Sequence, residues 1–109
     1  MLYVAGGQSA TVIRENTMQQ YNPATKSWIS EATMPTARYQ GAAASIGGQI
    51  YVAGGWGPSV PYDVLEAYNP ATNAWTSLAP MSHLSACGVA GVIDNQLYVF
   101  TPCNGFSGY

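Results

Sequence analysis

The sequence contains the same five-residue stretch twice, as Tyr21-Asn22-Pro23-Ala24-Thr25 and as Tyr68-Asn69-Pro70-Ala71-Thr72. The copies start 47 residues apart, and Trp28 returns as Trp75 at the same spacing. A second stretch, Tyr3-Val4-Ala5-Gly6-Gly7, returns 48 residues later as Tyr51-Val52-Ala53-Gly54-Gly55. Self-similarity at a fixed period indicates a repeat architecture, here with a unit of about 47 residues.

The sequence of each repeat unit predicts four short antiparallel strands. Gly47-Gly48, and Asp94-Asn95 one unit later, suit the two-residue turn of a hairpin because these residues tolerate positive φ. Asn69-Pro70 suits a type I turn, in which Pro takes the second position. The segments between these turns are short and show no helical period, so the sequence predicts a four-stranded meander in each repeat.

Side-chain size changes across the unit. The first predicted strand, 41–45, consists of Gly, Ala and Ser, whereas the third and fourth strands carry Tyr68 and Trp75. A sheet that is small at one edge and bulky at the other is what radial packing around an axis requires. A small sandwich with two similar hairpin sets is the alternative, and it gives no reason for the taper.

These residues resemble the kelch repeat, whose hallmarks are a di-glycine, then a Tyr and then a Trp. The resemblance implies an all-β fold of kelch-type β-propeller blades, which are four-stranded antiparallel sheets, in an incomplete ring. It also implies structural roles for the recurring residues, with the aromatic side chains packed between blades: Gly6, Gly7, Tyr21, Trp28, Gly54, Gly55, Tyr68 and Trp75.

We expect residues 1–109 to form a partial propeller of about 2.3 blades, from 109 residues and a repeat of 47. Residues 2–30 would supply the second to fourth strands of a first blade, 41–78 a complete second blade, and 87–101 the first two strands of a third.

Propellers need at least about four blades. Either the chain is a fragment of a longer protein, or several copies assemble. We favour the fragment, because joining the two ends into one blade would duplicate a strand.

Composition narrows the choice of partner. Charged residues make up 7% of the chain, and three cations with a net charge of -2 give no basic stripe for nucleic acid. No apolar run approaches the roughly 20 residues of a membrane span. We therefore expect a protein or a small polar or acidic ligand as partner, together with further propeller blades or self-association through exposed blade faces. The sequence leaves the compartment open.

Catalytic constellations are nearly absent. His83 is the only histidine, so a two-histidine metal site cannot be built from this chain, and the five acidic residues form no close pair with an acid–base task. We expect no catalytic residue, metal or cofactor, and a non-catalytic protein–protein or ligand-binding module that uses propeller rim loops. The alternative is a fragment of a kelch-fold enzyme, of the sugar oxidase or sialic acid mutarotase type, with its active site mostly on missing blades.

Residues that break the repeat are the best candidates for binding, and they fall in loops that emerge on one rim: Arg38, Tyr39, His83, Ser85, Arg14, Trp56 and Tyr62. The resemblance implies that Arg38 points toward the central opening, where its guanidinium could hold a carboxylate through two hydrogen bonds. A structural role fits Arg38 equally well, with the guanidinium bonded to loop carbonyls at the blade junction.

Two cysteines lie near the end of the chain. Counted back through the turn at Asp94-Asn95, Cys87 lies opposite position 102, next to Cys103. A bulge at Pro102 would bring the two sulfurs into bonding range, and such a disulfide would suit an extracytoplasmic protein. The alternative is a buried thiol at Cys87 and an unrelated loop cysteine at Cys103.

Overall fold

The structure is a computed structural model, and it describes residues 1–84 and 86–100. The described residues form nine β-strands and no helix, and none of them belongs to a helix that could cross a membrane. The strands are β1 (Leu2–Gly7), β2 (Glu15–Asn22), β3 (Ser27–Glu31), β4 (Ala42–Ile46), β5 (Gln49–Ala53), β6 (Leu65–Asn69), β7 (Ala74–Ser77), β8 (Val89–Ile93) and β9 (Gln96–Phe100).

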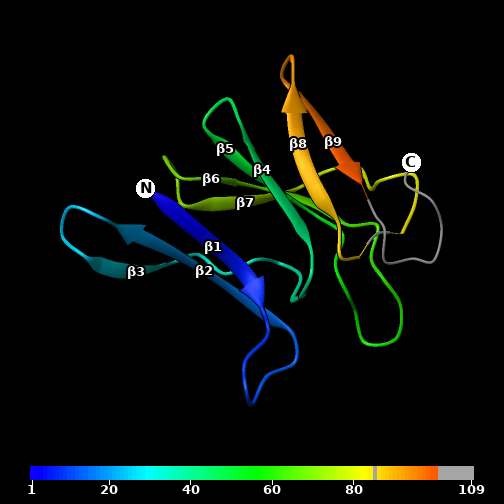
Figure 1. Cartoon of the computed structure of the whole chain (residues 1–109), viewed down its shortest axis with the longest axis horizontal. Coiled ribbons are helices and arrows are strands. Elements are labelled where there is room, and N and C mark those ends of the chain that lie inside the picture. The colour runs from blue at the N-terminus through cyan, green and yellow to red at the C-terminus, as the bar shows by residue number, and fades with distance from the viewer. Residues whose placement is uncertain (85, 101–109) are drawn as a thin grey trace.

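The strands form three antiparallel sheets, and in each sheet the strands follow chain order (Figure 1). The first sheet has the order β1-β2-β3, the second β4-β5-β6-β7, and the third β8-β9. The molecule measures 43 × 39 × 22 Å along its principal axes. The predicted all-β architecture of antiparallel sheets is confirmed, and the sheets do not close into a ring.

Turn chemistry explains where the strands end. Asp94 and Asn95 have φ values of 51° and 60° between β8 and β9, as the two-residue hairpin turn requires. After β6, the Asn69 side chain accepts a hydrogen bond from the Ala71 amide at 3.0 Å, and Asn22 accepts one from the Ala24 amide at 2.9 Å after β2. Both asparagines thus start their turns through a local side-chain contact.

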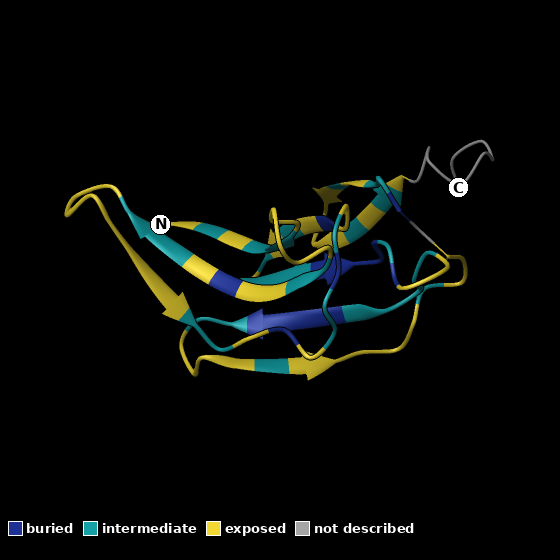
Figure 2. Cartoon of the chain, turned by 90° about the horizontal axis from the view of Figure 1, so that it is seen from below, coloured by how far each residue is buried: buried dark blue, intermediate teal, exposed yellow. Residues whose placement is uncertain are grey.

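The core lies between the first and second sheets. The rings of Tyr3 on β1 and Tyr68 on β6 are 6.1 Å apart between centroids. Tyr68 is buried, and so are Met18 on β2 and Met34 in the linker that joins the two sheets. Figure 2 shows the buried residues in the middle of the molecule, with exposed residues along the outer strands.

The innermost strands pack more closely than the outer ones could. β4 lies against β8 of the third sheet. Both strands are rich in small residues, with Ala42 to Ser45 in β4 and Ala90 and Gly91 in β8. Small side chains let two backbones approach, whereas the aromatic side chains of β6 and β7 fill the wider space toward the outside. The sequence taper therefore corresponds to the spacing of the sheets.

A two-point contact ties the end of the first sheet to the outer strand of the second. The Trp75 Nε1–H donates to the Ala32 carbonyl at 2.7 Å, and the Ala32 amide donates to the Asn73 side chain at 2.9 Å. Trp28 occupies the same repeat position in the first sheet, where no sheet of the described residues covers it, and it is 53% exposed. The two tryptophans thus differ in their surroundings and not in their place in the repeat.

This difference yields a stability prediction. Trp75→Phe removes the indole donor to Ala32, and we expect it to lower the free energy of unfolding by about 1 kcal/mol more than Trp28→Phe does. Urea unfolding of both variants measures the difference, and Trp28→Phe is the matched control because the same atoms are removed at an exposed repeat position. Equal losses would contradict the inter-sheet role of Trp75.

Candidate functional site

Three connecting segments meet at one edge of the molecule. The loop 8–14 joins β1 to β2, the loop 54–64 joins β5 to β6, and the linker 32–41 joins the first sheet to the second. Figure 1 shows both loops at the lower edge, opposite the hairpin turns between β4 and β5 and between β8 and β9. We call these three segments the rim.

Backbone hydrogen bonds join the linker to both sheets. The Gly7 amide donates to the Arg38 carbonyl at 2.9 Å, and the Arg38 amide donates to the Glu15 carbonyl at 3.0 Å. On the other side, the Trp56 amide donates to the Tyr39 carbonyl at 2.8 Å. The linker therefore runs between the end of the first sheet and the loop of the second, and it fixes the position of one relative to the other.

The di-glycines make this close approach possible. Gly6 has a φ of 67°, and a Cβ at this position would lie 2.7 Å from the Met34 Cε and 2.8 Å from the Arg38 carbonyl oxygen. At Gly55, with a φ of 101°, a Cβ would lie 3.0 Å from the Tyr39 carbonyl oxygen. Any side chain at these two positions would push the linker away from the sheet ends.

The Arg38 side chain lies beneath the rim in a buried ion pair with Glu66 of β6, and each residue is 1% exposed. The Arg38 Nη1 also donates to the Gly54 carbonyl at 2.8 Å, and the Thr36 hydroxyl donates to the second oxygen of Glu66 at 2.9 Å. Burial lowers the pKa of Arg38, and the Glu66 carboxylate acts against this shift. Both Arg38 and Glu66 thus have a further hydrogen-bond partner, which a buried ion pair needs in order to be stable.

The sequence left two roles open for Arg38, and the contacts are those of the structural one. Its guanidinium bonds to Glu66 and to loop carbonyls, which braces the junction of the two sheets. In this structure Arg38 is not exposed to a ligand at a central opening, because the linker and the di-glycine of the second sheet cover it. We therefore treat Arg38 as a residue that positions the rim.

The loop 54–64 is folded onto itself. The Gly57 amide donates to the Val60 carbonyl at 3.0 Å, and the Tyr62 amide donates to the Gly55 carbonyl at 2.8 Å. The Tyr62 ring lies directly over Gly57, where an added Cβ would be 2.6 Å from the ring. These contacts hold the loop in one shape while Val60, at its tip, is exposed.

The other rim candidates are distributed as follows. Tyr39, Trp56 and Arg14 are half-buried, whereas His83 is exposed, with its Nδ1 2.9 Å from the Ser82 hydroxyl. Ser85 lies outside the described residues. The structure thus brings Tyr39 and Trp56 together through their backbones, and Arg14 directly precedes β2 at the same edge.

The cysteine prediction falls partly outside the described residues, because Cys103 is not among them. Within the described part of the chain no cysteine is free. The same part contains no group of three or more His, Cys, Asp or Glu residues that could hold a metal ion.

The recurring aromatic residues pack within and between the sheets. The rings of Tyr68 and Trp75 lie 5.2 Å apart between centroids, and those of Tyr21 and Trp28 lie 4.9 Å apart. The Tyr68 hydroxyl donates to the Asn73 side chain at 2.8 Å. Burial raises the pKa of Tyr68, and the nearby Glu31 carboxylate raises it further, so the phenol stays neutral.

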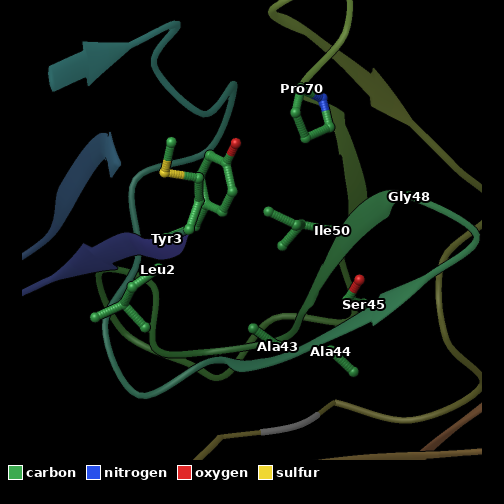
Figure 3. A pocket seen from close by; sticks show the side chains of 9 residues that line it. Leu2, Tyr3, Ala43, Ala44, Ser45, Gly48, Ile50 and Pro70 are labelled. Carbon is green, nitrogen blue, oxygen red and sulfur yellow. The ribbon is translucent and has the colours of Figure 1, made fainter. Parts of the chain in front are cut away.

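A pocket of about 340 Å³ lies between the first and second sheets, away from the rim (Figure 3). Leu2 and Tyr3 of β1 line one side, and Ala43 and Ser45 of β4 with Ile50 of β5 line the other. No Asp, Glu, Lys, Arg or His side chain lines it, and its polar side chains are those of Tyr3 and Ser45. Among the described residues β1 pairs with β2 alone, whereas the equivalent strand β5 pairs with both β4 and β6.

The comparisons with known proteins agree with this geometry. Residues 1–35 and 37–82 match the Kelch motif family. The chain belongs to the kelch-repeat family. The solved structure titled "Structure of YjhT" is similar to it, with 26% sequence identity and a TM-score of 0.79. The match covers 90% of this chain and 30% of that one, so the chain spans less than a third of that relative's length. No curated protein matches the chain.

The kelch resemblance is therefore confirmed, and each sheet of the structure is a propeller blade or part of one. The sequence alone did not identify Glu66 as the partner of Arg38 at the junction of the first and second sheets. A signal existed in the repeat itself. Glu66 stands where the first unit has Gln19, and Arg38 stands where the next unit has Ser85, so the charged pair occurs at one junction only.

The ion pair gives a second stability prediction. Arg38→Ala leaves the Glu66 carboxylate buried without its partner, and we expect the free energy of unfolding to fall by about 3–5 kcal/mol. The double variant Arg38→Met/Glu66→Leu removes both charges, and we expect it to unfold at a higher urea concentration than Arg38→Ala. A double variant that is no more stable than Arg38→Ala would contradict the pairing, even where Arg38→Ala alone is largely unfolded.

Proposed function

We propose that the chain is a non-catalytic binding module that holds a protein partner on its rim. The observation that carries this proposal is the rim's construction. Its loops are fixed by backbone hydrogen bonds and rest on the buried Arg38–Glu66 pair, while their tips expose apolar side chains. A rigid base under exposed loop tips is the usual arrangement of a protein-binding surface.

The exposed side chains suit a protein surface better than a charged small ligand. Val12 and Ile13 are exposed in the loop 8–14, and Val60 is exposed in the loop 54–64. Tyr39 and Trp56 are half-buried in the linker 32–41 and the loop 54–64 of the same rim. Apolar and aromatic side chains with few charges are typical of the buried centre of protein interfaces.

The polar candidates complete the proposed surface. Arg14 precedes β2 at the end of the loop 8–14, and His83 is exposed in the segment that leads to β8. An arginine and a histidine at the edge of an apolar patch would set the orientation of a partner more than the strength of its binding. Arg38 supports this surface from below and acts by keeping the linker in place.

The proposal makes the rim tips the centre of binding. Ile13→Asp and Val60→Asp would each place a charge at the centre of the interface, and we expect each to weaken binding by at least about tenfold, the effect of a hot-spot residue. The probe is a peptide enriched from a random display library on the immobilised chain, and affinity is measured for each variant by titration.

Ile29→Asp is the matched control, because Ile29 is exposed on β3 and lies outside the rim. We expect this variant to bind the enriched peptide as the parent chain does. Failure to enrich any peptide, or binding that is lost with Ile29→Asp and kept with Val60→Asp, would overturn the proposal.

A further inference from the structure

The β4-β5 and β8-β9 hairpins have the same register. Ala42 pairs with Ala53, and Val89 pairs with Phe100, each residue standing 47 positions after its counterpart in the earlier pair. The two hairpins are also neighbours, because β4 lies against β8. The β4-β5 hairpin therefore serves as a template for how the chain before β8 and the chain after β9 come together.

In the template, the pairing continues beyond the ends of the strands. Tyr39 and Trp56 form an antiparallel bridge in the same register, and the Trp56 amide donates to the Tyr39 carbonyl at 2.8 Å. A Cβ on Gly55 would lie 3.0 Å from that carbonyl oxygen and 3.2 Å from the Gly41 amide nitrogen. Gln40 thus lies opposite Gly55, one residue away from the bridge to Trp56.

One repeat later, these positions carry the two cysteines of the chain. Cys87 stands 47 residues after Gln40, and Cys103 stands 47 residues after Trp56. Cys103 lies outside the described residues, so the template alone gives its place, next to the residue opposite Cys87. A disulfide joins Cα atoms about 4.4–6.8 Å apart, a range that includes the distances between neighbouring strands.

The backbone at Cys87 provides the irregularity that such a bond needs. In a regular strand pair, successive side chains point to opposite faces of the sheet, so residues offset by one would point apart. Cys87 has a φ of 54° and Gln40 has a φ of 58°, so neither residue continues an extended strand. The Cys87 amide donates to the Gln40 carbonyl at 2.9 Å, which holds this turn in place. A bulge at Pro102 is then not required.

The state of Cys87 agrees with the template. Cys87 is disulfide-bonded and not free, and the chain contains one other cysteine. We propose that Cys87 and Cys103 form a structural disulfide that closes the base of the β8-β9 hairpin. Ser85 stands where the second unit has Arg38, so a covalent bond replaces the ion pair as the brace of this segment. This inference does not rest on the proposed function of the rim.

The bond forms by thiol–disulfide exchange. The thiols of Cys87 and Cys103 together lose two electrons and two protons, and a small-molecule disulfide such as oxidised glutathione takes them up and leaves as two thiols. The fold favours the bond because it holds the two sulfurs close together. By linkage, the bond stabilises the folded chain to the same extent, since it closes the loop 87–103 in the unfolded chain as well.

Equilibration with glutathione measures this coupling. The chain is held at a series of ratios of reduced to oxidised glutathione, with and without denaturing urea, and its free thiols are alkylated and counted by mass spectrometry. We expect half of the chain to be reduced in native buffer at a ratio at least about tenfold higher than in urea. Equal ratios would overturn the proposal. So would two free thiols in oxidised glutathione, or disulfides that join two copies.

Urea unfolding gives an independent measurement. We expect reduction to lower the urea midpoint of the parent chain, because the unfolded chain is then no longer cross-linked. The double variant Cys87→Ser/Cys103→Ser is the matched control, and we expect it to unfold at the midpoint of the reduced parent, with or without reductant. A reduced parent chain that is as stable as the oxidised one would contradict a structural role for the bond.

Discussion

The structure depends on the junction between its first and second sheets, which the linker 32–41 forms as one of the three segments of the rim. Arg38 and Glu66 neutralise each other there in a buried position, and the guanidinium also donates to the backbone carbonyls of Gly54 and Val64. A charged pair at this depth is stable only while the surrounding groups stay in place. The linker, the ends of the strands and the loop 54–64 are therefore fixed together.

That junction connects folding to the surface we propose for binding. The loop 54–64 is bonded to the linker through the Trp56 amide and the Tyr39 carbonyl, and the strand ends that flank the loop 8–14 are bonded to it at Arg38. The Arg38–Glu66 ion pair joins the linker to β6. A loop that is already ordered loses less entropy when a partner binds. The junction thus supplies a fixed base beneath the exposed side chains of the loop tips.

Much of the fold could be predicted because the repeat preserves local chemistry. Contacts between neighbours in sequence account for the turns that start at Asn22 and Asn69 and for the hairpin turn at Asp94. The small residues of β4 are visible in the sequence directly. The pairing of Arg38 with Glu66 could not be predicted in the same way, since the residues lie 28 positions apart and occur at a single junction. The stacking of Tyr62 on Gly57 depends on how one loop folds, and no repeat position encodes it.

The central claim is that equivalent residues differ in environment because one sheet has a neighbour and the other does not. Hydrogen exchange of the indole N–H groups, followed by NMR on the dilute chain, tests it most directly. The account predicts slow exchange for Trp75, whose indole is bonded to the Ala32 carbonyl, and fast exchange for Trp28. Equal exchange at the two tryptophans, or faster exchange at Trp75, would contradict it.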